Sequence, residues 1–182
     1  MKCNLLNNQS SRLHQNASPM KNCLRVHWFF ASLFVAILAP SLCSAWSGKV
    51  VSVSSGDTIN VLHKGKVEKV RLYGIYAPQK KQSFEKKARD FASSFVNGEN
   101  VEVEQKGADK NGRTIGLVSV SGEAINELMV INGYAWVHRQ YCKEKFCTDW
   151  IKMEDAARQG KKGMWNDPNL ILPKELQSPK GK

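Results

Sequence analysis

The sequence predicts a mostly β fold with α-helices: a five-stranded barrel with about three helices packed against it. Five short segments alternate apolar and polar residues and are separated by turn residues, which is typical of strands that bury one face. Three longer segments repeat apolar residues at helical spacing, and helices follow the third and the fifth strand. A single small barrel can bury all of these elements around one core.

The five expected strands form two groups. The first three make a meander over residues 49–54, 58–62 and 66–73, with turns at Gly56 and at the His63-Lys64-Gly65 group. The other two cover residues 100–105 and 114–120, and the Asn111-Gly112 pair between them predicts a tight, exposed loop. This number of strands, with helices inserted between and after them, fits the five-stranded OB-fold barrel.

Three helices are expected beside these strands. Residues 84–96 carry phenylalanines and alanines on one face, and the Asn97-Gly98 pair ends that helix. Residues 123–131 and 146–159 are also amphipathic, and each segment stops at a turn that contains glycine. We expect Trp136, Trp150 and Trp165 to belong to the core rather than to a surface that stacks on bases.

The first 45 residues are expected to be a targeting segment. Residues 28–38 are an uninterrupted run of apolar and small residues, preceded by Lys21 and Arg25 and followed by small residues at 43–45, as in a signal peptide. The run is too short to span a bilayer, although a retained anchor is the alternative. Because residues 1–19 are polar, Met20 is the better start. We therefore expect export to the periplasm or beyond, without stable membrane association after cleavage.

The rest of the chain reads as one domain, residues 46–169, with a tail at 170–182 that contains prolines and lysines. The 182 residues include 27 Lys plus Arg against 16 Asp plus Glu, a formal charge of +11, and 42% are hydrophobic. Cleavage at residue 45 removes four basic residues and no acidic one, which leaves +7. This excess suggests an anionic partner, although basicity alone equally fits plain solubility. We expect a monomer.

Only two of the five cysteines, Cys142 and Cys147, lie beyond the expected cleavage point. An even pair in an exported chain predicts a disulfide. Half of a zinc site is the weaker alternative, because no second pair of ligands follows at suitable spacing. Two reduced thiols remain the other alternative.

Three segments resemble the staphylococcal nuclease (thermonuclease) family. They are Ser-Gly-Asp-Thr at 55–58, Arg-Leu-Tyr-Gly-Ile-Tyr-Ala-Pro-Gln at 71–79, and Asp-Lys-Asn-Gly-Arg at 109–113. Their order and spacing, and the helix that follows Pro78, are similar to the family pattern over residues 50–167. Similar secreted members also carry a Tyr-Cys pair before the last helix, which matches Tyr141-Cys142 together with Cys147.

The resemblance implies an OB-fold enzyme that hydrolyses DNA and RNA phosphodiesters with calcium. Asp57 matches a metal-binding aspartate, and Ala77 would offer its backbone carbonyl to the ion, which prefers hard oxygen ligands. Arg71 and Arg113 match the two arginines that bind the phosphate, a task suited to the guanidinium fork. Further contacts to nucleic acid are expected from Lys110 and Tyr141.

Two departures from the family pattern change this expectation. Tyr76 stands where the family has its second metal-binding aspartate, and Gln79 stands where it has the glutamate that acts as general base. A neutral phenol is a poor calcium ligand, and an amide cannot accept the proton of the attacking water. General-base assistance is worth about 10²- to 10⁴-fold in rate. The sequence therefore predicts weak or absent hydrolysis and makes calcium doubtful.

A binding function can survive these losses. Asp57 with Arg71 and Arg113 carries a formal +1, the same charge as three carboxylates, two arginines and Ca²⁺ in the family pattern. We therefore expect metal-free binding of nucleic acid or another phosphate ester. One alternative is an active calcium-dependent endonuclease in which Glu85 replaces a lost acid, and another is a structural or protein-binding domain. In that last case Asp57 would be a turn residue, Arg71 its ion-pair partner, and Arg113 a solvated loop charge.

Overall fold

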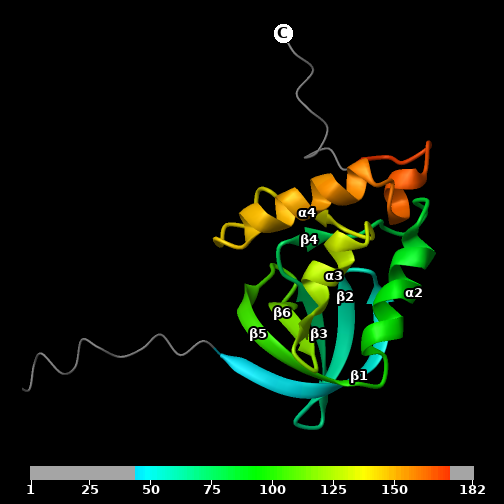
Figure 1. The fold of residues 1–182 in the computed structure, drawn as a ribbon. Helices are drawn as coiled ribbons and strands as arrows, with labels where there is room; N and C mark the ends of the chain where they lie inside the picture. The colour runs from blue at the N-terminus through cyan, green and yellow to red at the C-terminus, as the bar shows by residue number, and fades with distance from the viewer. Residues whose placement is uncertain (1–43, 173–182) are drawn as a thin grey trace, which may run out of the picture. The chain divides into compact units, whose positions relative to one another are not determined.

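Five long strands close into a barrel. The computed structural model describes residues 44–172, in which β1 (Ala45–Ser55), β2 (Thr58–His63) and β3 (Lys66–Leu72) form an antiparallel meander. The strand β5 (Asn100–Ala108) pairs with β1, and β6 (Thr114–Val120) pairs with β5. A parallel pairing of β3 with β6 then closes the sheet (Figure 1). The predicted five-stranded, OB-type barrel is confirmed.

Four short elements were not predicted. Strands β4 (Ile75–Tyr76) and β8 (Trp136–Val137) form a separate two-stranded sheet, β7 (Glu123–Ala124) pairs with β6, and a 3₁₀ turn, η1, covers Gly163–Asn166. The three strands have two residues each and therefore show no alternation that the sequence pattern could indicate. The strand expected at 66–73 ends one residue earlier, at Leu72.

Three helices cover the barrel as expected, with small shifts of their starts. Helix α2 (Glu85–Val96) runs along its side, α3 (Ile125–Ile131) packs against β6, and α4 (Cys147–Gln159) packs against α3 (Figure 1). Helix α2 begins one residue later than predicted because Phe84 has a positive φ of 67°. The first two residues of the expected helix at 123–131 belong to β7 instead.

The core lies inside the barrel and under the helices. Trp136 and Trp150 are buried as predicted, with 1% and 3% of their surface exposed, and the half-buried Trp165 contacts the edge of Trp136. The buried side chain of Asn126 fixes α3 to the barrel: its amide donates to the carbonyls of Tyr73 (2.9 Å) and Gly116 (3.3 Å) and accepts from the N–H of Val118 (3.0 Å). These three hydrogen bonds join α3 to β6 and to the residue that follows β3.

A disulfide joins Cys142 to Cys147, as predicted. It packs directly on Gly74, where a Cβ atom would lie 2.7 Å from the sulfur of Cys142, so only glycine fits there. No helix in residues 44–172 is long and apolar enough to cross a membrane. Nearly all of the expected targeting segment and most of the expected tail lie outside the described residues, and the boundaries at 46 and 169 stay predictions.

Candidate functional site

Closure of the barrel brings Arg71 and Arg113 to one place. In the parallel pairing of β3 with β6, Val70 lies opposite Thr114, and the two arginines are the residues next to this pair. Both line a pocket of about 570 Å³. Lys110 and Tyr141 line the same pocket. The structure therefore brings together all four residues that the sequence assigned to nucleic-acid contact.

Asp57 lies behind Arg71, at the turn between β1 and β2. Its side chain is 3% exposed, and its carboxylate lies 3.6 Å from the guanidinium of Arg71. The preceding residue, Gly56, lets the turn approach the next layer: a Cβ there would lie 2.9 Å from the Cβ of Ala77 and 3.0 Å from that of Ala88. A small residue at 56 is therefore required to bring Asp57 against the segment that follows β4.

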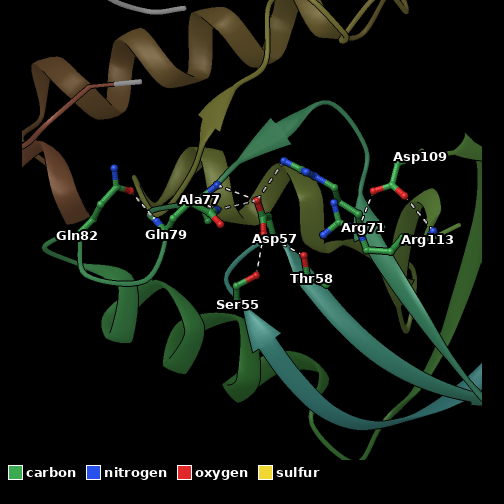
Figure 2. A network of polar contacts seen from close by, with 9 residues as sticks. All are labelled: Ser55, Asp57, Thr58, Arg71, Ala77, Gln79, Gln82, Asp109 and Arg113. Carbon is green, nitrogen blue, oxygen red and sulfur yellow. Dashed lines mark hydrogen bonds and ion pairs between the residues drawn. The ribbon is translucent and has the colours of Figure 1, made fainter. Parts of the chain in front are cut away.

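The carboxylate of Asp57 is surrounded by protein donors (Figure 2). Its Oδ1 accepts from the hydroxyls of Ser55 (2.8 Å) and Thr58 (3.0 Å). Its Oδ2 faces the backbone N–H of Ala77 and the side-chain amide of Gln79, both at 3.4 Å, in addition to Arg71. Two oxygens have about four lone-pair sites between them, so these five donors use the capacity of the group.

The residues around Asp57 do not fit a calcium ion. The carbonyl of Ala77 already accepts from the amide nitrogen of Gln79 at 2.8 Å, and Tyr76 turns its ring to Arg71, with the guanidinium carbon 5.6 Å from the ring centre. Glu85, considered as a substitute acid, pairs with Arg89 at 3.2 Å. Within residues 44–172 no three His, Cys, Asp or Glu side chains gather where a metal could bind, whereas calcium takes six to eight oxygens, with carboxylates prominent.

A second aspartate, to which the sequence pattern assigned no role, pairs with the other arginine. Asp109 accepts from the Nε of Arg113 at 2.6 Å and from the backbone N–H groups of Asn111 and Arg113 at 2.8 and 3.0 Å. Partial burial raises the pKa of Asp109, but these hydrogen bonds from Arg113 and Asn111 outweigh it and lower the pKa below its ordinary value of 3.8. An aspartate two residues before the Asn-Gly turn could have indicated this bond.

Asp109 corrects the predicted charge of the site. The two aspartate–arginine pairs together are neutral, not +1, so any positive excess in the pocket comes from Lys106 and Lys110. Lys106 is itself 2.9 Å from a carboxylate oxygen of Glu104. The pocket is less positive than the sequence suggested, and each of its two arginines has an aspartate partner.

One wall of the pocket is aromatic. His138 lines the pocket and contacts the rings of Tyr76 and Tyr141, at 6.0 and 4.5 Å between ring centres. Its backbone N–H donates to Gly74 at 2.7 Å, and its carbonyl accepts from the N–H of Cys142 at 2.8 Å. The disulfide therefore anchors the end of this wall, where Tyr141 is 63% exposed.

A buried acid supports the same wall from α4. Glu154 is 3% exposed and accepts from the backbone N–H of Val137 at 2.9 Å and from Arg139 at 3.3 Å. Burial raises the pKa of Glu154 above its ordinary value of 4.5, although both hydrogen bonds act in the opposite direction. Because β8 pairs with β4, this contact also fixes Tyr76.

The closed barrel, with two aspartate–arginine pairs at one pocket, defines the class of protein as an OB-type domain. Residues 69–167 match the protein family described as staphylococcal nuclease homologue. An "Uncharacterized endonuclease" of Escherichia coli is 37% identical over 135 residues, 74% of this chain and 86% of the relative. A "Micrococcal nuclease" of Shigella flexneri is 34% identical over 165 residues, 85% of this chain and 93% of the relative.

This chain belongs to the staphylococcal nuclease family. The matched residues include the whole pocket but begin after Asp57. "Protein ParB" of Escherichia coli, 34% identical over 152 residues that cover 79% of this chain and 85% of the relative, is a further similar protein.

Proposed function

We propose that the domain binds nucleic acid, or another phosphodiester, between Arg71 and Arg113 without a metal ion, and that it hydrolyses this ligand weakly or not at all. One observation carries the proposal. The pocket keeps both arginines and Lys110, while the oxygens of Asp57 and Ala77 accept hydrogen bonds from the protein itself.

The geometry of the two arginines supports phosphate binding. Arg71 is 25% exposed and lies 3.6 Å from Asp57, a long contact that leaves N–H groups for a phosphate oxygen. Arg113 uses its Nε for Asp109, so its two terminal nitrogens remain for a ligand. A guanidinium binds two oxygens of one phosphate in a fixed geometry. Membership of a nuclease family makes nucleic acid the favoured phosphodiester.

Weak hydrolysis follows from the chemistry of two side chains. The amide of Gln79 holds no lone pair basic enough to take a proton from water, and Tyr76 supplies no carboxylate for a metal. Asp109, the carboxylate that lines the pocket, does not replace them, because it is bonded to Arg113. We therefore expect this protein to bind a phosphodiester and to cleave it weakly or not at all.

The test is the affinity for a fluorescent single-stranded oligonucleotide, measured in CaCl₂ and in EDTA. We expect equal affinity in both solutions and a steep fall with salt, because phosphate contacts release counterions. Arg71→Ala and Arg113→Ala should each weaken binding about 10-fold and lower the salt slope by about one. Arg89→Ala, which removes the same charge on α2 outside the pocket, is the matched control. Complete loss of binding in EDTA would overturn the proposal.

A calcium-dependent endonuclease is the second candidate, favoured by the names of the two relatives called nuclease or endonuclease. Incubation of the protein with plasmid DNA and RNA in CaCl₂ or EDTA separates the two candidates. Calcium-dependent degradation by the wild-type protein would establish the enzyme. If the binding protein is correct, only the double variant Tyr76→Asp with Gln79→Glu should degrade the substrates.

We infer further that the domain acts as a monomer outside the cytoplasm. The apolar run at residues 28–38 and the disulfide between Cys142 and Cys147 support export, because disulfides persist in oxidising compartments. The intact mass of the processed protein tests export, and size-exclusion chromatography tests the monomeric state. A mature chain that begins at Trp46 is expected, and a mass that retains residues 1–45 would contradict it.

A further inference from the structure

The side chain of Gln79 bridges two oxygen groups that, by the family resemblance, would bind calcium. Its Nε2 donates to the carbonyl of Ala77 at 2.8 Å and faces Oδ2 of Asp57 at 3.4 Å. Both partners are acceptors without a proton to donate. The amide must therefore present its nitrogen here, since its oxygen would face two other oxygens.

We propose that the amide of Gln79 takes the structural place of a divalent cation between Asp57 and the Ala77 carbonyl, and so positions Arg71 and the segment after β4 without metal. Gln79 is a positioning residue, because it acts on Arg71 through the carboxylate that both side chains share. The inference concerns the same pocket as the proposed function, but it does not depend on nucleic acid being the ligand.

The physical need for such a group is plain from the burial of Asp57. A carboxylate that is 3% exposed costs free energy unless donors surround it. Asp57 and the Ala77 carbonyl share one donor group, the Nε2 of Gln79, and each would lose a hydrogen bond without it. The guanidinium of Arg71 supplies positive charge to Asp57 from the other side.

A glutamate at position 79 would have the opposite effect. It has nearly the shape of glutamine but would place a third acceptor against the same two oxygens. In its charged form, this side chain would repel both oxygens unless a cation bound all three groups. The identity of residue 79 therefore decides whether this segment of the barrel depends on metal.

The experiment is thermal unfolding of the full chain in EDTA and in millimolar CaCl₂, with no nucleic acid present. Wild type should show the same Tm in both solutions. Gln79→Glu should lower Tm in EDTA by about 5 °C, and calcium should restore most of that loss. Gln79→Met has a similar shape but no hydrogen-bond donor. Its Tm in EDTA should fall by a similar amount, and calcium should not restore it.

Gln82→Glu is the matched control. Gln82 lies in the same loop, and its Oε1 accepts from the backbone N–H of Gln79 at 2.6 Å, a role that a carboxylate oxygen can also fill. This variant should therefore resemble wild type in both solutions.

Two results would overturn the inference. One is a wild-type Tm that rises with calcium as much as that of Gln79→Glu, and the other is a Gln79→Glu loss that calcium leaves unchanged. If Gln79→Glu does not fold in EDTA, far-UV circular dichroism decides: folding on addition of calcium supports the inference, and continued disorder overturns it. Because nucleic acid is absent, failure of the proposed binding function would leave these outcomes unaffected.

Discussion

The pocket has an aspartate–arginine pair on each side, and the two pairs differ in which partner is fixed. Asp57 is 3% exposed and surrounded by five donors, and Arg71 contacts it at 3.6 Å. Asp109 lies in a loop and has 15% of its side chain exposed, and Arg113 contacts it at 2.6 Å. Asp57 is therefore fixed by donors from the barrel, whereas Asp109 fixes the position of Arg113.

This difference separates two roles that the same residue types perform. Asp57 organises the layer beneath the pocket, since its partners come from the β1–β2 turn, from β3 and from the segment after β4. Asp109 organises only five residues of loop, because both N–H groups that it accepts lie within 111–113. Loss of the first should damage the fold, and loss of the second should damage only the position of Arg113.

The largest expected effect is therefore on stability. Asp57→Ala leaves several donors without an acceptor, in the buried region around Thr58 and Ala77, and should lower the free energy of unfolding by about 3 kcal/mol. Asp109→Ala should lower the free energy of unfolding much less, because water can reach the N–H groups that donate to Asp109. Urea denaturation in EDTA measures both losses.

Ser55→Ala is the control for the first variant, because it removes one donor to Asp57 and leaves the carboxylate in place. Ser55→Ala should lower the free energy of unfolding by only a small part of the amount that Asp57→Ala does. Equal losses for Asp57→Ala and Asp109→Ala, or no loss for the first, would contradict the contrast between the two pairs.

A smaller effect concerns pH. The pKa of Asp109 is lowered in the folded protein, so its contribution to stability is fully present above the ordinary value of 3.8. This contribution is lost as the pH falls below 3.8 through the lower folded pKa, because both states then become protonated. Wild type should thus be more stable than Asp109→Asn at pH 6, and the difference should shrink toward pH 3. Denaturation across this range would measure it, and a constant difference would show that the charge of Asp109 is not involved.

Much of the fold was predictable from the sequence because burial on one face imposes a period. The five long strands and three helices follow that period, and each boundary shifted by only a few residues. The short strands β4 and β8 were not predictable, since two residues carry no pattern and their pairing depends on how the chain folds around Glu154. Alternation of apolar and polar residues thus indicates the strands of the barrel, whereas tertiary contacts determine the short strands β4 and β8.

The sequence indicated which of the candidate residues would lie near one another, but not the contacts that they make. The resemblance placed Arg71, Arg113, Lys110 and Tyr141 together, and they line one pocket. It did not indicate that Asp109 neutralises one of these arginines, because the family motif identifies residues by position and not by contact. The bridging amide of Gln79 likewise depends on a side-chain orientation that only the structure gives.

The smallest expected effect is on oligonucleotide affinity, and it concerns how Arg71 is held in place. The ring of Tyr76 lies near Arg71, with the guanidinium carbon 5.6 Å from the ring centre, so the ring helps to hold an arginine that its aspartate holds only loosely. Tyr76→Phe keeps that ring and should change oligonucleotide affinity less than about 2-fold, whereas Tyr76→Leu should weaken it by about 3-fold, the loss of one exposed cation–π contact. Fluorescence anisotropy in EDTA can resolve both changes. A large loss with Tyr76→Phe would instead assign a direct role to the phenol hydroxyl, and the loose pairing of Arg71 would then need a different explanation.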